Sequence, residues 1–426
     1  MPRIRLVHAA DLHLDTPFEG IAGPAPQVRE ALYEASLDSW DALVRFTIAE
    51  DASGLLLAGD LYDGERRGVR AQLRVLSGLR ELSRAGVQTF IVHGNHDPLG
   101  GWSAIREWPP GTHVFGHEEV EVVPLEQAEA TVGHVHGISY GRRDVADNLA
   151  MRFRRGAAPG PHFGLLHANV GGSREHAAYA PCTLSDLQQT GMDYWALGHI
   201  HRREVLRSGD PWVVYPGDLQ GRSPKPSETG AKGAYLVEFD ADGGGILPPT
   251  FHPLDRIRFI ALHHDIAACP DLPALHAGLL DALTRLRDEH DGRGLLVRIV
   301  LEGRGAVAAD LRRPEALHEI RSELRQRFAD CRPFLWVEVL RDRTAPTLDL
   351  AALRARAEFS AEVLDLAEGL EADPEAVTAF IAQRSTQLAT GQVGRQVRDL
   401  PTDADAEILA EALACVLDRL EAGDQA

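Results

Sequence analysis

Lysine is nearly absent from this sequence of 426 residues, in which only Lys225 and Lys232 stand against 42 arginines. The four cysteines are scattered and form no CxxC pair, which argues against a structural zinc site and fits a reducing compartment. A signal peptide is also lacking, as is any apolar run of the ~20 residues needed to span a membrane. We therefore expect a soluble, cytoplasmic protein with no membrane contact.

An excess of positive charge is lacking too, because 63 Asp and Glu outnumber 44 Lys and Arg, for a formal net charge of -19. This balance argues against binding nucleic acid by bulk electrostatics, although it is compatible with a local basic groove. Residues 345–426 hold 16 acidic side chains, six arginines and no lysine, a net charge of -10. The length is two to three times the ~150 residues of one average domain, so several domains are expected.

Short apolar runs alternate with helical patterns in the first part of the chain. The runs at 5–9, 54–58 and 89–92 predict buried strands, whereas apolar residues recur every three or four positions over 31–50 and 69–85, which predicts amphipathic helices. This alternation favours a layered α/β domain. A turn carrying Asp, His, Gly or Asn follows each run, and in such folds functional sites gather at the carboxyl ends of strands.

From about residue 256 the pattern changes to a small β-α-β-α-β unit. Its expected elements are strands at 259–264, 294–301 and 334–340 and helices at 271–289 and 314–328. Residues 344–347, Thr-Ala-Pro-Thr, have the composition of a linker. We therefore predict three parts, which are a first domain of residues 1–255, a small α/β domain of residues 256–343 and an acidic helical region of residues 344–426.

The acidic C-terminal region is predicted to form amphipathic helices. Its apolar face comprises Ile408, Leu409, Leu413, Val416, Leu417 and Leu420. Such a face either packs on its own chain or docks on a partner, and the sequence leaves both interpretations open.

Five separated clusters of metal-ligand residue types occur in the first domain. They are Asp11-x-His13, Gly59-Asp60-x-x-Asp63, Gly94-Asn95-His96-Asp97, His167, and Gly198-His199-x-His201. Alone, each cluster is weak, because Asp-x-His is usually an ordinary pair and Gly-Asp is commonly only a turn. Together, imidazole, carboxylate and amide groups suit divalent manganese, iron or zinc better than calcium. The glycines permit tight turns that bring ligands from separate strands together.

The order D-x-H, G-D-x-x-D, G-N-H-D, H, G-H-x-H resembles the signature of calcineurin-like metallophosphoesterases. The segments 10–18 and 215–222 are most similar to the SbcD/YhaO-type DNA repair exonucleases. The resemblance implies a layered β-sandwich flanked by helices, followed by a small α/β capping domain and C-terminal helices. It is strong to about residue 255, moderate to 343 and thin beyond.

The resemblance also implies two divalent ions, with Mn²⁺ favoured over Fe²⁺ or Zn²⁺. The first ion would be bound by Asp11, His13, Asp60 and His201, and the second by Asp60, Asn95, His167 and His199. Asp60 would therefore bridge the two ions. Two cations held in this way stabilise both the attacking and the leaving oxygen of a phosphodiester.

His96 corresponds to the family histidine that is not a ligand. It would contact the phosphoryl oxygen or protonate the leaving group, and Asp97 could orient it. Many relatives have a histidine in place of Asp63, so the role of this residue is open. The second G-H-x-H, at residues 133–136, precedes His167 and is therefore out of the family order, so we interpret its histidines as strand residues.

Three functions are compatible with these motifs. The resemblance favours a DNA nuclease in DNA repair with an SMC-like ATPase partner of the SbcC or YhaN type, and relatives are often homodimers. Arginines beside the motifs could contact DNA phosphates without reading sequence, or could lie on ordinary solvated faces; they include Arg66, Arg67, Arg70 and Arg202. The alternatives are a phosphoesterase for small nucleotides, cyclic nucleotides or phosphoproteins, and a metal-bound scaffold for DNA ends or the ATPase with little catalysis.

Overall fold

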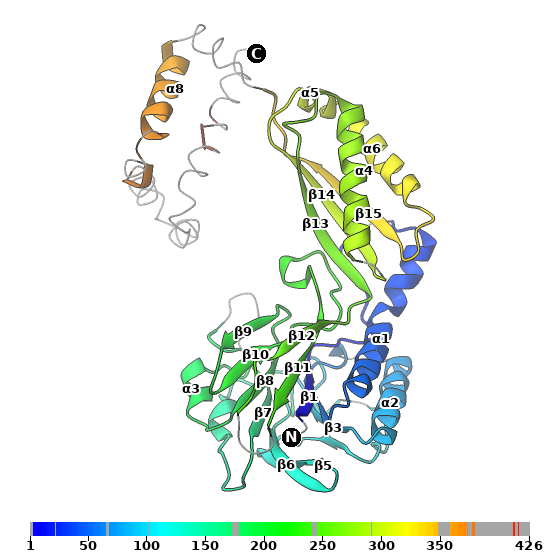
Figure 1. Ribbon diagram of the computed structural model, residues 1–426, viewed down its shortest axis with the longest axis vertical. Helices are drawn as coiled ribbons and strands as arrows, with labels where there is room; N and C mark the ends of the chain where they lie inside the picture. The colour runs from blue at the N-terminus through cyan, green and yellow to red at the C-terminus, as the bar shows by residue number, and fades with distance from the viewer. Residues whose placement is uncertain are drawn as a thin grey trace. The chain divides into compact units, whose positions relative to one another are not determined.

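The computed structural model describes most of the first 347 residues and a few segments beyond them (Figure 1). The described residues are 3–21, 23–64, 68–101, 103–172, 179–240, 245–290, 292–347, 358–371, 373, 377–379, 412, 413 and 416. They form two compact units, one from residues 1–263, 278–300 and 317–341 and the other from residues 264–277, 301–316 and 342–426. The domain boundaries expected after residues 255 and 343 stay predictions.

The first sheet has six strands in the order β12-β11-β1-β2-β3-β4. Strands β1 to β4 are mutually parallel, and β11 and β12 extend the other edge in antiparallel pairing. The strands are β1 (Ile4–Ala9), β2 (Gly54–Ala58), β3 (Gln88–Val92), β4 (Thr112–Val114), β11 (Gly233–Phe239) and β12 (Thr250–Pro253). Every residue of β2 is buried, as expected for a central parallel strand covered on both faces.

The second sheet has six strands in the order β5-β6-β7-β8-β10-β9. Its central strands β6, β7, β8 and β10 run parallel, and β5 and β9 close the edges in antiparallel pairing. The strands are β5 (Glu121–Gln127), β6 (Ala130–Gly137), β7 (His162–His167), β8 (Tyr194–Gly198), β9 (Glu204–Arg207) and β10 (Trp212–Tyr215).

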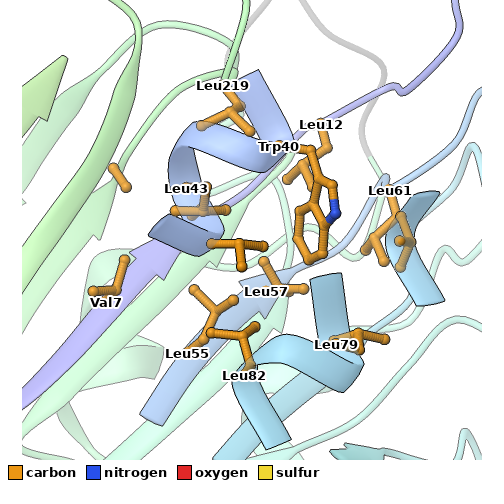
Figure 2. Close-up of a cluster of buried hydrophobic side chains, with 14 of the residues drawn as sticks. Val7, Leu12, Trp40, Leu43, Leu55, Leu57, Leu61, Leu79, Leu82 and Leu219 are labelled. Carbon is orange, nitrogen blue, oxygen red and sulfur yellow. The ribbon is translucent and has the colours of Figure 1, made fainter. Parts of the chain in front are cut away.

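The two sheets pack face to face around one apolar core. Leu56 and Phe90 of the first sheet share a fully buried cluster with Phe163 and Ala196 of the second. Helices α1 (Pro26–Ala49) and α2 (Val69–Arg84) cover the outer face of the first sheet, where Trp40 lies in a second cluster (Figure 2). Helix α3 (Leu184–Gln188) and the 3-10 turn η2 (Leu149–Arg152) lie against the second sheet. The predicted layered β-sandwich with flanking helices is confirmed.

The small α/β region, from β13 to β15, follows the turn η3 (Pro226–Glu228) and the last two strands of the first sheet. Its three strands have the order β13-β14-β15. Its elements are β13 (Ile257–Asp265), α4 (Leu272–Glu289), β14 (Gly294–Glu302), α5 (Ala308–Leu311), α6 (Ala316–Arg327) and β15 (Leu335–Asp342). The expected β-α-β-α-β order is therefore present, with the short helix α5 as an addition.

Only part of the acidic C-terminal region is described, chiefly helix α8 (Glu358–Glu371). Of the predicted apolar face, Leu413 and Val416 are described, and both are helical. The other members of that face lie outside the described residues, so its packing stays open. Among the described helices, none is both long enough and apolar enough to cross a membrane.

Candidate metal centre

The five ligand clusters follow the carboxyl ends of five parallel strands drawn from both sheets. Asp11 follows β1, Asp60 follows β2, Asn95 follows β3, His167 ends β7 and His199 follows β8. Each strand is a short apolar run that the core covers on both faces, so the first polar residue beyond its end lies at the same edge of the sandwich. The fold thus brings together residues that are up to 190 positions apart in the sequence.

Asp60 lies between two groups of histidines. Its Oδ2 is 3.3 Å from Nε2 of His167 and 3.8 Å from Nε2 of His13. These histidines belong to the two different predicted ion sites. One carboxylate that faces both sites has the geometry expected of a bridging ligand.

The remaining predicted ligands form close pairs on either side of Asp60. Nε2 of His13 and Nε2 of His201 are 3.2 Å apart, and Asp11 lies in the same cluster. On the other side, Oδ1 of Asn95 is 3.0 Å from Nε2 of His167 and 3.2 Å from Nδ1 of His199. Together with Asp60, all seven residues expected to bind metal thus lie around one centre.

The hydrogen bonding of His167 tests whether this centre fits a cation. Its Nδ1 lies 2.9 Å from the carbonyl oxygen of Ala58, so Nδ1 carries the hydrogen and Nε2 presents a lone pair. That lone pair faces two further acceptors, Oδ1 of Asn95 and Oδ2 of Asp60. Buried acceptors that converge without a donor between them repel one another, and a divalent cation removes the repulsion. The residues therefore fit a metal site.

Burial and charge act in opposite directions on the carboxyl groups. Without a metal ion, a proton on Nε2 of His167 takes the place of the cation. Burial would raise the pKa of Asp60, but the charge and the hydrogen bond of this protonated His167 outweigh it and hold that pKa well below its ordinary value. Burial raises the pKa of Asp11 to about 6, in spite of the opposing charges of His167 and His201. Asp60 is therefore the carboxylate that stays ionised most readily, as a bridging position requires.

The backbone at the centre is held in unusual conformations. Four of the predicted ligands have positive φ, namely Asp11 (50°), His13 (42°), Asp60 (51°) and His199 (102°). Non-glycine residues adopt this region at a cost, and such residues cluster at functional sites. At Gly59 a Cβ would lie 2.5 Å from Nδ1 of His167, so the close approach of the strands requires glycine there.

His96 stands beside the metal cluster and is held by Asp63. Its Nδ1 is 2.5 Å from Oδ1 of Asp63, its backbone N–H donates to Asp60, and about a third of both side chains is exposed. Burial alone would lower the pKa of His96, but the hydrogen bond to Asp63 and the nearby carboxylate charges raise it above its ordinary value. Asp63, whose role was open from the sequence, therefore orients the imidazole of His96 and raises its pKa.

Asp97 does not orient His96, in contrast to our prediction. Its carboxylate accepts hydrogen bonds from the backbone N–H groups of Asp60, Leu61 and Gly94, and it lies 3.1 Å from Nδ1 of His93. The side chain is fully buried, and its hydrogen bonds hold the loops after β2 and β3 together. The sequence could not separate Asp97 from Asp63, because only the fold shows which carboxylate faces the imidazole.

The predicted strand that carries the second G-H-x-H is β6. His136 there lies 2.7 Å from Nδ1 of His162, and the ring of His134 stacks on the same residue. His8, on β1, contacts the hydroxyl of Tyr194. None of the possible metal-binding groups found among the described residues includes these histidines.

The arginines expected near DNA have diverse surroundings. Arg70 forms an ion pair with Glu34, and Arg74 pairs with Asp41 through its Nε at 2.9 Å, so both connect α2 to α1. Arg202 is exposed. Arg66 and Arg67 lie outside the described residues, and the predicted phosphate contacts therefore stay predictions.

Several charged residues of the segment 217–233 lie at the site but were not predicted to belong to it. Asp218, Glu228 and Lys232 are buried behind His201, and Arg222 lies close enough to contribute to lowering the pKa of His13. Among the described residues, no hydrogen bond or ion pair of the Arg222 side chain is found, and its Nε is buried. The signals in the sequence were the charged residues clustered within 218–232 and the family-like segment 215–222, which contains Asp218 and Arg222.

A β-sandwich that gathers this ligand set at the carboxyl ends of its strands defines the class of calcineurin-like phosphoesterases. The family model of calcineurin-like phosphoesterases matches residues 4–203, and that of the metallophosphoesterase YhaO middle domain matches residues 259–345. The chain belongs to the metallophosphoesterases of this family, and is therefore a hydrolase of phosphoester bonds with a site for two metal ions.

Among curated proteins, the chain is similar to the uncharacterized metallophosphoesterase YhaO of Bacillus subtilis. The two are 34% identical over 87% of this chain and 91% of the relative. A more distant relative is the DNA double-strand break repair protein Mre11 of Methanopyrus kandleri, with 27% identity over 61% of this chain and 59% of that protein. Another belongs to the nuclease SbcCD of Rhodobacter capsulatus, with 26% identity over 48% of this chain and 60% of that protein.

Proposed function

We propose that this protein is a manganese-dependent DNA nuclease of DNA repair that works with an SMC-like ATPase. The observation that carries the proposal is the dyad of His96 and Asp63 beside the cluster in which Asp60 faces both His13 and His167. That arrangement suits a phosphodiester, whose leaving oxygen needs a proton while its charge is neutralised. DNA as the substrate is supported by the distant relatives, of which one is named as a DNA repair protein and another as part of a nuclease.

The residues have separate tasks in this reaction. When bound, the two ions would activate a water and neutralise charge on the phosphate. His96, oriented by Asp63 and with its pKa raised by it, would donate a proton to the leaving oxygen. Asp97 would keep the loops after β2 and β3 in register, because it binds backbone N–H groups of both. Manganese is favoured over calcium because the ligand set combines nitrogen and oxygen donors.

Arg222 is the best-placed cation for the phosphate backbone among the described arginines. Its positive charge lowers the pKa of both His13 and Asp63. For His13, only burial has a larger effect. Arg70 and Arg74 are already paired with acidic residues of α1, whereas the buried Nε of Arg222 has no partner among the described residues. A guanidinium with free donors suits a phosphate oxygen.

A homodimer through α1 and α2 is part of the proposal. Tyr33, Val69 and Leu73 on these helices are more than half exposed, and a groove of about 570 Å³ runs along Leu37, Val69, Arg70, Leu73, Arg74 and Ser77. The ion pairs of Arg70 and Arg74 with acidic residues of α1 place both signs of charge beside the apolar surface, which suits a self-complementary two-fold interface. Light scattering of Val69→Glu and Leu73→Glu variants tests this: both should be monomeric.

The test of the main proposal compares substrates. Purified protein with Mn²⁺ would be given linear duplex DNA, single-stranded DNA, bis-para-nitrophenyl phosphate and a cyclic nucleotide, alongside the His96→Ala variant. We expect hydrolysis of DNA and of the small diester, both lost in the variant. Hydrolysis of the cyclic nucleotide without cleavage of DNA would favour the small-nucleotide alternative. DNA binding with no hydrolysis of any substrate would favour the scaffold alternative.

A further inference from the structure

A buried network of charged side chains holds His201 from the side away from the metal cluster. Nδ1 of His201 is 3.4 Å from Oε1 of Glu228, at the long end of the hydrogen-bond range. The carbonyl oxygen of His201 accepts a hydrogen bond from Nζ of Lys232 at 2.8 Å and from the backbone N–H of Asp218 at 3.3 Å. Both the ring and the backbone of this residue are therefore fixed.

The two charged partners are themselves anchored. The second oxygen of Glu228 accepts the backbone N–H of Arg222 at 2.8 Å, and 7% of Glu228 is exposed. Lys232 forms an ion pair with Asp218 and also donates to the carbonyl oxygen of Ser227. Buried ion pairs stabilise folds little, because desolvation offsets their attraction. Their concentration behind one predicted ligand therefore points to a role at that ligand.

We propose that Glu228 and Lys232 are positioning residues that hold His201 in the orientation and tautomer needed to bind a metal ion. Glu228 accepts the Nδ1–H, which leaves the lone pair of Nε2 directed toward Nε2 of His13, 3.2 Å away. A carboxylate behind a histidine ligand also strengthens the nitrogen as a donor to the metal. Lys232 fixes the carbonyl of the same residue, so the ring cannot move away with its backbone.

This inference rests on His201 being a ligand, and the first experiment measures metal binding rather than activity. Free Mn²⁺ would be followed by electron paramagnetic resonance during titration of metal-free protein. We expect Glu228→Ala to weaken one of the two sites about 10- to 100-fold, the usual cost of losing such a partner. Glu228→Gln keeps one oxygen that can accept from either of the two N–H groups bound by Glu228, so this variant should lose less metal affinity. The His201→Ala variant serves as the reference for loss of that site.

The two lysines of the chain offer a matched control. Lys225 is exposed and Lys232 is buried. The double variant Asp218→Asn with Lys232→Met removes both buried charges together, so neither is left unpaired. It should weaken the same site as Glu228→Ala, whereas Lys225→Met should bind both ions as the wild type does.

A thermal measurement separates positioning from a general structural role. Bound metal raises the melting temperature by an amount that grows with the logarithm of its affinity for the folded state. Glu228→Ala should therefore show a smaller increase on addition of Mn²⁺ than the wild type, beyond any change in the metal-free protein. Wild-type affinity at both sites in Glu228→Ala, with one site lost in His201→Ala, would overturn the proposal. Two sites retained in His201→Ala would instead show that the ligand assignment is wrong.

Discussion

Asp63 holds Nδ1 of His96 at 2.5 Å from its own Oδ1, and this contact makes His96 both oriented and more basic. Replacing Asp63 with Asn keeps the size of the side chain and removes its charge. The pKa of His96 should then fall. If His96 acts as the acid, activity is lost as pH rises through that pKa, so the alkaline limb of the activity profile should move to lower pH.

The measurement is the pH profile of kcat for a small phosphodiester with Mn²⁺. Turnover of Asp63→Asn should fall, but by less than the about 10²- to 10⁴-fold expected for His96→Ala, which removes the acid itself. His134→Ala, on β6, is the control and should leave the profile unchanged. An alkaline limb that stays in place in Asp63→Asn would contradict the assignment.

A second prediction concerns the bridging role of Asp60. This carboxylate faces His13 on one side and His167 on the other, so Asp60→Asn should weaken both ion sites. Asn95→Ala should mainly weaken the site of His167 and His199. Metal content per chain, measured by plasma mass spectrometry after dialysis, distinguishes these outcomes. Two ions retained in Asp60→Asn would exclude a bridge.

A third prediction concerns stability at acidic pH. Burial lowers the pKa of His8 to about 3, although its hydrogen bond to the carbonyl of Leu197 acts in the opposite direction. On acidification, His8 binds a proton near pH 6.5 in the unfolded chain but only near pH 3 in the folded protein. The stability of the fold therefore falls as pH decreases between these values. The slope is at most about 1.4 kcal/mol per pH unit. His8→Gln should therefore show a shallower loss between about pH 6 and 4 in denaturant titrations of metal-free protein.

A fourth prediction concerns the acidic C-terminal region as a binding site for the ATPase. Ala345 exchanges backbone hydrogen bonds with Gly303 and Gly305, and Arg304 donates to the carbonyl of Pro346, so a truncation should retain these residues. Deletion of residues 348–426 should leave the melting temperature and small-diester turnover near wild type and abolish capture of the SMC-like ATPase. Full capture by the truncated protein would place the partner site elsewhere, and aggregation would favour packing on its own chain.

The sequence predicted the elements well where local patterns determine them. Strands β13 and β14 and helices α2 and α4 begin and end within about two residues of the expected ranges, because apolar periodicity and flanking turns mark them. The ligand set was implied by the family resemblance, and the structure brings its seven residues together because the five clusters lie at or just beyond the ends of apolar strands; metal binding by these residues stays a prediction. Contacts between side chains could not be predicted from the sequence. Periodic patterns carry no sign of the pairing of His96 with Asp63 or of Lys232 with Asp218. Such pairs depend on how loops from different strands meet.

The order of strands in the first sheet also affects how the protein is made. Strand β1 is synthesised before the other strands of its sheet, yet one of its two neighbours is β11, which follows it by more than 200 residues. During synthesis, one edge of β1 therefore remains unpaired until residue 239, the end of β11, has left the ribosome. Asp11 and His13 follow that same strand, so a nascent chain cannot assemble the complete centre early. Binding of both ions would in this way wait until the sandwich is closed.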